Sequence, residues 1–282
     1  FIIKSDILSI RFIRDEEGYK RPTNFIKSKY TTPVIDKKSN LVGTNENATS
    51  ELSDLMGTEL FSYPKPVSLI KHLINFTADE DDIVLDFFSG SGTTAEAVFN
   101  LIIAENIKLR FILVQLPENL DENLAKADST ERKTLENGIA FLDRLGKPHF
   151  LTELAKERIR RAGKKAVEEL NAKNNQLQLG EESVDSSKLD IGFRVYKTDE
   201  SNLKDVFYHP AKLDQKQLAF VESNIKDDRT PEDLLTQVIL DLGLELSLPI
   251  ETKKIGKNTV FIVQTNALVA CFDNDIDFKI VD

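Results

Sequence analysis

The clearest pattern of apolar and polar positions lies near the middle of the chain. Residues 83–85 are a short apolar run, which predicts a strand buried on both faces of a parallel sheet. Asp86 ends the run, and Gly90 and Gly92 then permit a sharp turn with close backbone approach. Residues 93–101 carry apolar side chains at helical spacing, so an amphipathic helix is expected. A strand, a glycine turn and a helix together place free amide N–H groups beside a ligand.

Further elements follow from similar patterns. A second apolar run at 110–116, ended by Pro117, predicts a second buried strand. A helix is expected from Pro66, which suits the first helical position, with an apolar face of Val67, Ile70, Leu73 and Ile74. A long helix is expected over 152–171, and the segment 119–138 is expected to be a loose, partly helical excursion.

The two ends of the chain carry other signals. A strand is expected at 7–13, and a short helix at 48–56 with Asn47 or Thr49 as its cap. The C-terminal part predicts a strand at 190–198, a helix that starts at Thr230-Pro231-Glu232-Asp233 and runs through LLTQVILDLGLEL, a hairpin turning at 256–258 and a strand at 267–273.

Composition limits the class of protein. The 282 residues are 40% hydrophobic and 30% charged, ordinary values for a globular protein with two domains. No apolar run approaches the roughly 20 residues that span a bilayer, and no signal peptide is visible. A single cysteine, Cys271, excludes disulfides and cysteine metal sites, and predicts a buried thiol in a cytoplasmic protein. The chain starts at Phe1 without an initiator Met, as expected for part of a longer protein.

Charge argues against most of this chain lying on DNA, because the net charge is −10. The helix expected at 152–173 is an exception, with seven Lys and Arg against four Glu. It could face DNA phosphates or an acidic partner, or it could be a solvated helix face.

The glycine turn leaves several ligands open. Its sequence GSGTTA fits the dinucleotide fingerprint G-x-G-x-x-G/A only with Ala95 at the third position. No Lys follows Gly92, as a phosphate-binding P-loop requires. Asp86 disfavours a pyrophosphate and suits a cationic or zwitterionic ligand. The turn could also be only a connection between a strand and a helix.

Longer strings around the turn resemble a known family. DFFSGSGTTAEA (86–97) resembles motif I of S-adenosylmethionine-dependent amino methyltransferases that act on DNA. ELSDLMGTELFSYPKPVSLIKHLI upstream, and FILVQLPENLDE and FLTELAKERIRRAGKKA downstream, resemble the modification subunit of type III restriction–modification systems. The resemblance covers most of residues 20–175 and extends more loosely to the C-terminus.

The resemblance implies an S-adenosylmethionine site. Tyr63-Pro64-Lys65-Pro66 is similar to motif X, which binds the methionine end of the cofactor, and Lys65 is the expected partner of its carboxylate. Asp86 is expected near the positively charged end, and the turn glycines beside the methionine. Gln115 or Glu118 is expected at the ribose hydroxyls, where an acid is usual. The full expected set is Tyr63, Lys65, Pro66, Asp86, Phe88, Ser89, Gly90, Ser91, Gly92, Thr93, Thr94, Gln115 and Glu118.

One motif of the family is missing. Asp/Asn-Pro-Pro-Tyr/Phe binds the target amine and stacks on the flipped base, but this chain contains no Pro-Pro pair. In the subgroup that matches best, that motif and the target-recognition region precede motifs X and I, an order that fits 63–66 and 86–94 here. We therefore expect the C-terminal portion of a larger subunit, with no catalytic residue and no metal site in this chain.

The expected function follows from the resemblance. The parent protein would transfer a methyl group to adenine N6 in a specific DNA site, bound mainly through the missing upstream region, and this fragment would be inactive alone. One alternative is an assembly module that docks a restriction subunit or a second modification subunit as a homodimer. A weaker one is a nicotinamide-dependent oxidoreductase, disfavoured by Asp86 and the absent glycine.

The expected fold is α/β: half of a doubly wound methyltransferase sheet, followed by a small α+β C-terminal domain. The expected divisions are the end of an upstream region and a connecting segment (1–60), the cofactor-binding half (61–175), a linker (176–188) and the C-terminal domain (189–282).

Overall fold

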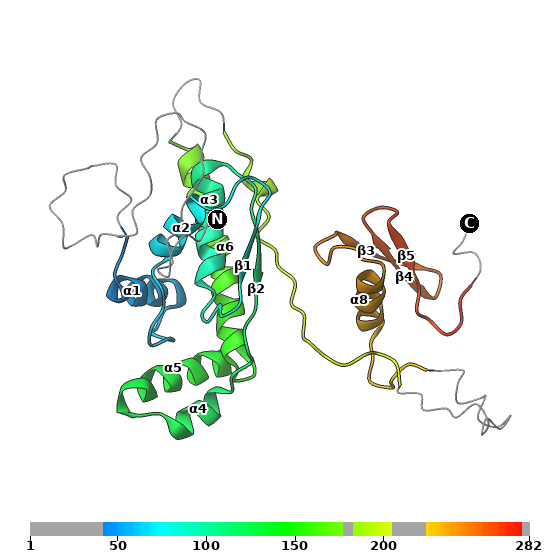
Figure 1. Cartoon of the computed structure of the whole chain (residues 1–282), viewed down its shortest axis with the longest axis horizontal. Helices are drawn as coiled ribbons and strands as arrows, with labels where there is room; N and C mark the ends of the chain where they lie inside the picture. The colour runs from blue at the N-terminus through cyan, green and yellow to red at the C-terminus, as the bar shows by residue number, and fades with distance from the viewer. Residues whose placement is uncertain (1–41, 177–182, 205–223, 278–282) are drawn as a thin grey trace, which may run out of the picture. The chain divides into compact units, whose positions relative to one another are not determined.

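A computed structural model describes residues 42–176, 183–204 and 224–277 (Figure 1). The chain divides into two compact units, residues 1–192 and 193–282, and each is described by itself. The strand expected at 7–13 lies outside the described residues.

Unit 1 is built on a pair of parallel strands. Its elements around this pair are α2 (Val67–Asn75), β1 (Ile83–Asp86), α3 (Thr93–Glu105) and β2 (Arg110–Leu113). β1 lies beside β2, with Val84 opposite Phe111, and α3 connects the two strands (Figure 1). Apolar side chains of α2 and α3 pack against Val84 and Phe111, so both helices cover the same face of the pair. The expected strand–turn–helix–strand order is confirmed.

The two strands are not buried on both faces, which corrects the prediction made from their apolar runs. Ile83 and Leu85 are each 48% exposed, and Ile112 of β2 is 49% exposed. Successive side chains of a strand point to opposite faces, so α2 and α3 bury only the alternate residues. Within the described part of the chain, the second face lacks the helical layer that full burial requires.

Helix α3 is buried around most of its circumference, whereas its sequence predicted a single apolar stripe. All residues from Thr93 to Phe99 are buried, and so is Leu101. The cause is that α3 packs at once against α2, α6 and β2. In α2, by contrast, Val67 and Ile74 are buried but Leu73, expected on the apolar face, is 38% exposed.

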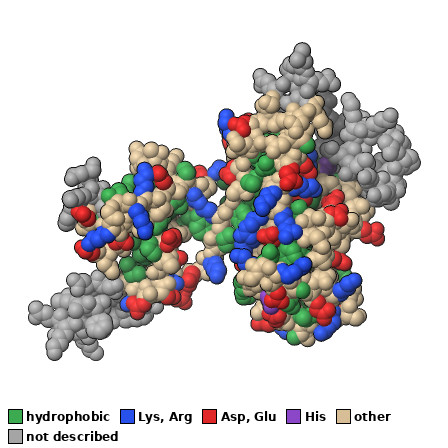
Figure 2. All heavy atoms as spheres, turned by 180° about the vertical axis from the view of Figure 1, so that it is seen from behind, with side chains coloured by type: hydrophobic (Ala, Val, Ile, Leu, Met, Phe, Trp, Pro, Cys, Tyr) green, Lys and Arg blue, Asp and Glu red, His purple; other side chains and the backbone are tan. Residues whose placement is uncertain are grey.

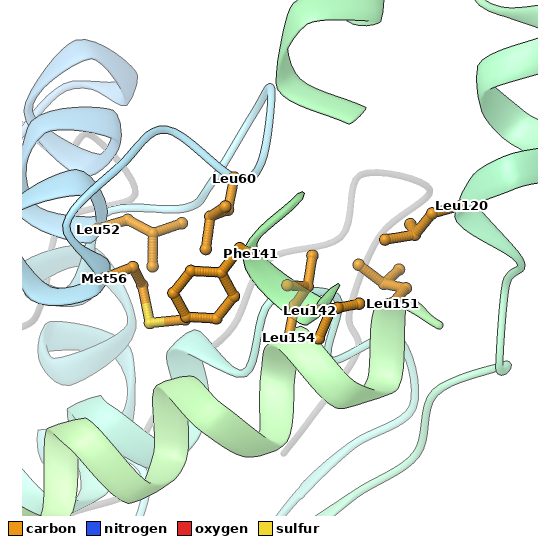
Figure 3. Packing of buried hydrophobic residues seen from close by; sticks show 8 residues of the cluster. All are labelled: Leu52, Met56, Leu60, Leu120, Phe141, Leu142, Leu151 and Leu154. Carbon is orange, nitrogen blue, oxygen red and sulfur yellow. The ribbon is translucent and has the colours of Figure 1, made fainter. Parts of the chain in front are cut away.

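A second core of unit 1 is formed by helices outside the strand pair. They are α1 (Asn45–Met56), α4 (Leu120–Lys126), α5 (Ser129–Leu145) and α6 (Leu151–Asn174). Figure 3 shows Leu52 and Met56 of α1 beside Phe141 of α5. Leu142 and Leu154 continue the cluster toward α4 (Figure 3). This core fixes α6, which runs on to contact α3.

Polar N-cap side chains fix where three of these helices begin, and some of these caps were not predicted from the sequence. Thr44, not Asn47 or Thr49, is the N-cap of α1, and Asn47 completes its capping box. Asn119 and Asp128 each cap a helix with the side chain. The segment 119–138, expected to be a loose and only partly helical excursion, is helical over most of its length, as α4 and the first part of α5.

His149 joins α4 and α5 just before α6. Its Nε2 lies 2.9 Å from Asp143 Oδ1, and its Nδ1 lies 2.9 Å from Asp121 Oδ2. Hydrogen bonds to Asp143 and then to Asp121 raise the pKa of His149 above its ordinary value of 6.5. The folded chain thus favours the protonated imidazole.

We expect this contact to make stability depend on pH. Because the folded pKa of His149 is raised, its stabilisation is complete below about pH 6.5 and is lost as pH rises through the raised pKa. Urea unfolding at several pH values should show the free energy of unfolding falling over that interval, and His149→Gln should remove that part of the fall. Parallel pH profiles for the two proteins would contradict this.

Unit 2 is a three-stranded antiparallel sheet with one helix. Its elements are α8 (Pro231–Asp241), β3 (Ile250–Ile255), β4 (Asn258–Val263) and β5 (Leu268–Ala270), in the sheet order β3-β4-β5. Leu235 and Ile239 of α8 pack against Phe261 and Val263 of β4. The hairpin expected at 256–258 is confirmed, since β3 and β4 pair around it.

Three expectations for the C-terminal part are corrected. Residues 190–198 form no strand: among the described residues no strand pairs with their backbone, and the side chains of Arg194 and Tyr196 bind the carbonyl of Leu246. α8 ends at Asp241 instead of continuing through LGLEL, and Gly243 follows with φ +66°. Cys271 is a free thiol and only half-buried.

None of the helices described in either unit is long and apolar enough to cross a membrane.

Candidate functional site

The glycine turn lies where β1 and β2 both end. Because the strands are parallel, their carboxyl ends meet at one edge, where ligands bind in open α/β sheets. The N–H of Ser89 donates to the carbonyl of Val114 at 3.2 Å. The N–H of Gly90 donates to Gln115 Oε1 at 2.8 Å. The turn and the end of the second strand therefore form one site.

Asp86 binds the turn with both carboxylate oxygens. The Thr94 hydroxyl donates to Oδ2 at 2.6 Å, and the N–H of Phe88 donates to Oδ1 at 3.0 Å. Asp86 thus ties the end of β1 to the first turn of α3. Its approach to the positive end of a cofactor stays a prediction.

Gly90 and Gly92 both need the left-handed backbone that glycine tolerates, with φ of +51° and +81°. A Cβ on Gly90 would lie 3.5 Å from Phe61 Cζ. A Cβ on Gly92 would lie 3.5 Å from the carbonyl oxygen of Ala155 in α6. Gly92 therefore allows the turn to pack closely on α6. This role was not predicted from the sequence.

Gly92→Leu is expected to destabilise unit 1 more than Gly57→Leu. Both glycines have similar φ values, +81° and +85°, so both variants carry similar backbone strain. A Cβ on Gly57 has no atom within 4 Å, whereas the Gly92 side chain would enter α6. Overpacking of this kind costs about 1–3 kcal/mol. Urea denaturation measures the difference, and equal losses would show that the turn does not pack closely on α6.

Arg158 of α6 is hydrogen-bonded to the glycine turn. This contact was not predicted from the sequence. Its side chain is 2% exposed. Nη1 donates to Ser91 Oγ at 2.6 Å and to Thr93 Oγ1 at 2.7 Å. Nε and Nη2 both donate to Glu96 Oε2, at 3.0 and 2.8 Å. Burial lowers the pKa of Arg158 and Glu96 opposes this shift; the guanidinium remains charged.

A local signal could have revealed Arg158. In the α6 sequence, Leu154, Arg158 and Ala162 stand four residues apart, so Arg158 lies on the buried stripe of the helix. A charged side chain on such a stripe needs a buried partner. Glu96 in the first turn of α3 is that partner, 62 residues away in the sequence.

The predicted basic face of α6 is smaller than the sequence suggests. Besides Arg158, Arg161 also makes a contact within unit 1, since its Nη1 donates to the carbonyl of Met56 at 2.9 Å. Its guanidinium also lies 5.1 Å from the ring centroid of Phe141. Arg160 and Lys165 remain 46% and 54% exposed. Figure 2 shows both Lys and Arg and Asp and Glu side chains spread over one face of the molecule.

The residues on either side of motif X pack near the turn. Phe61 lies against Gly90, and α2 packs on α3. Tyr63 is 60% exposed and Lys65 is exposed. Pro66 is buried and is the N-cap of α2, with extended backbone, rather than its first helical residue.

The two candidate ribose ligands lie together at the end of β2. Gln115 Nε2 donates to Glu118 Oε1 at 3.4 Å, and Glu118 Oε2 accepts from Asn123 Nδ2 at 3.2 Å. Near them Phe88 is 90% exposed and Leu116 is 73% exposed. By contrast Ser89, Ser91, Thr93 and Thr94 are buried. The cofactor set from the sequence is thus divided into an exposed rim and a buried base.

No group of three or more His, Cys, Asp or Glu side chains among the described residues could hold a metal ion.

Comparison with known proteins identifies related chains. Residues 13–114 match the family described as DNA methylase. The chain is 31% identical over 252 residues to the type III restriction-modification enzyme EcoP15I Mod subunit of Escherichia coli, which covers 82% of this chain and 32% of that protein. It is 34% identical over 114 residues to the StyLTI Mod subunit of Salmonella typhimurium, covering 40% of this chain and 17% of that protein.

A third match is the EcoPI Mod subunit of Escherichia phage P1, 44% identical over 79 residues, or 28% of this chain and 12% of that protein. The chain thus spans no more than about a third of the length of these relatives. The matches confirm the resemblance drawn from the motifs: this chain is related to the modification subunits of type III restriction–modification systems, and its residues 13–114 match the DNA methylase family.

Proposed function

We propose that this chain holds the cofactor-binding half and the C-terminal part of a site-specific DNA methyltransferase. The whole protein would transfer a methyl group from S-adenosylmethionine to adenine N6 in a restriction–modification system. The observation that carries the proposal is the glycine turn at the joined ends of β1 and β2, with Gly90 bonded to Gln115. The relation to Mod subunits supports the choice of reaction.

Each part of the site has a proposed role. Lys65 would bind the cofactor carboxylate, and Asp86 would favour its positive end. The left-handed glycines would let the backbone N–H groups at the start of α3 approach the methionine, and Gln115 with Glu118 would bind the ribose. The sulfonium supplies a reactive methyl group, so the protein mainly positions donor and amine. A nicotinamide dinucleotide suits this site less well, because Asp86 would repel its pyrophosphate.

The open face of the strand pair fits this assignment. We place β1 and β2 in a doubly wound sheet whose remaining layers come from parts of the protein outside the described residues. In such sheets both faces are covered by helices, whereas Leu85 and Ile112 here are about half exposed. The test is calorimetric titration with S-adenosylmethionine of this chain and of a longer chain that includes the upstream half. Absence of binding by both would reject the proposed function.

This chain alone is expected to show no methyl transfer to DNA. It has no Pro-Pro-aromatic motif to hold the target amine. Incubation with radiolabelled S-adenosylmethionine and unmethylated genomic DNA should leave the DNA unlabelled, whereas the longer chain should label it. Transfer by the 282-residue chain above a no-protein control would mean that the amine is bound by other residues.

A second role, assembly, is favoured by unit 2. It is a compact unit of its own with exposed apolar side chains at Leu240, Leu242 and Val269. It could dock a restriction subunit or a second modification subunit. Removal of residues 193–282, a cut that follows the boundary between the units, should then abolish association and spare cofactor affinity. Unchanged association would exclude unit 2 as the docking module.

A further inference from the structure

We propose that Arg158 is the positioning residue of the cofactor turn. In this inference, which rests on the proposed function, the guanidinium on α6 holds the Ser91 and Thr93 hydroxyls. It thereby keeps the turn in the conformation that presents the N–H groups at the start of α3 to S-adenosylmethionine.

The contacts of Arg158 divide between two tasks. Nε and Nη2 bind Glu96 Oε2 within 3.0 Å, which compensates the buried charge. Nη1 points to the turn, where it binds Ser91 Oγ at 2.6 Å and Thr93 Oγ1 at 2.7 Å. The ion pair with Glu96 would compensate the charge without these two bonds. The bonds to the hydroxyls therefore need an explanation beyond charge compensation.

The position of the hydroxyls supplies that explanation. Ser91 and Thr93 are the residues on either side of Gly92, which has φ +81°. A glycine is the residue whose backbone rotates most freely, and α3 begins directly after it. A single nitrogen that holds both neighbours prevents this rotation. The backbone of the turn is then ordered before any cofactor arrives, which lowers the entropy cost of binding.

The hydroxyls themselves face away from solvent. Ser91 is 7% exposed and Thr93 is 6% exposed. Both were expected among the cofactor-binding residues on the basis of the motif. We assign their side chains to the contact with Arg158, and the N–H groups at the start of α3 to the cofactor.

Two variants separate this role from general stability. Arg158→Lys keeps the charge but replaces the planar fork with a single ammonium, which cannot reach Glu96 and both hydroxyls in the same geometry. Ser91→Ala combined with Thr93→Val removes only the hydroxyls and leaves the ion pair with Glu96. Arg160→Lys is the matched control, because it lies on the same helix and is 46% exposed.

The first measurement is hydrogen–deuterium exchange of the full 282-residue chain without ligand. The N–H groups of Ser89, Gly90 and Gly92 are hydrogen-bonded in the turn. Their exchange should rise at least about tenfold in Arg158→Lys and in the double hydroxyl variant, while exchange in α4 and α5 stays at the wild-type rate. Wild-type exchange of the turn in a folded Arg158→Lys protein would overturn the proposal.

The second measurement is titration with S-adenosylhomocysteine, the demethylated product. Affinity should fall at least about tenfold in Arg158→Lys and in the double hydroxyl variant. Combining the three substitutions should add little, because each variant already removes the contact between Arg158 and the hydroxyls. An additive loss would mean that the hydroxyls contact the cofactor directly. If the wild-type chain and the longer chain both fail to bind while the exchange still responds, the proposed function fails and the ordering role of Arg158 stands.

Discussion

Gly90→Leu is expected to abolish binding of S-adenosylmethionine while leaving the chain folded. Gly90 has φ +51°, a conformation that costs a side-chain residue about 1–2 kcal/mol. A Cβ there fits at 3.5 Å from Phe61 Cζ, but the rest of a Leu side chain must displace Phe61 or cover the turn. Either change removes the surface proposed for the methionine. Calorimetry gives the affinity, and thermal unfolding gives the stability.

Gly146→Leu is the matched control for this experiment. Gly146 has a similar φ of +60°, and a Cβ there meets no atom within 4 Å. It should lose similar backbone stability and retain cofactor binding. Normal binding by the Gly90→Leu protein, measured on the longer chain, would make the turn only a connection between β1 and α3 and remove the main support for the methyltransferase assignment.

Arg158→Met is expected to cause the largest loss of stability from a single change. It leaves Glu96, whose side chain is 8% exposed, as a buried charge without its partner. Breaking a buried pair in this way costs about 3–5 kcal/mol. It also leaves the Ser91 and Thr93 hydroxyls without their donor. Urea denaturation of the full chain measures the change.

A double replacement tests the cause of this loss. Arg158→Met with Glu96→Leu removes both charges, so much of the stability should return. Arg160→Met, on the exposed side of α6, should change stability by no more than about 0.5 kcal/mol. If the double variant is no more stable than Arg158→Met, the loss comes from packing rather than from the unpaired carboxylate.

The elements that the sequence predicted well depend on local signals. Gly90 and Gly92 after an apolar run mark the β1–α3 turn, and the Thr230 capping box with Pro231 marks the start of α8. These signals act within a few residues, so they need no knowledge of the rest of the fold. The hairpin between β3 and β4 was predictable for the same reason, because Gly256 adopts φ +61° at its turn.

The features that the sequence did not predict depend on distant residues. An apolar run cannot show whether one face or both faces of a strand will be covered, and Leu85 is 48% exposed for this reason. The strand expected at 190–198 did not form, because a strand needs a neighbour to pair with and no described strand pairs with this segment. In the candidate site, the contact of Phe61 with Gly90 likewise required the tertiary structure.

The most direct test of the central claim is ultraviolet cross-linking of radiolabelled S-adenosylmethionine, followed by tryptic mapping. Lys71 and Lys108 bound one peptide, residues 72–108, that holds the entire turn, and residues 111–126 hold Gln115 and Glu118. We expect label in these peptides, competed by S-adenosylhomocysteine and lost in Gly90→Leu. Competed label confined to residues 193–282, or found only outside these two peptides, would contradict it.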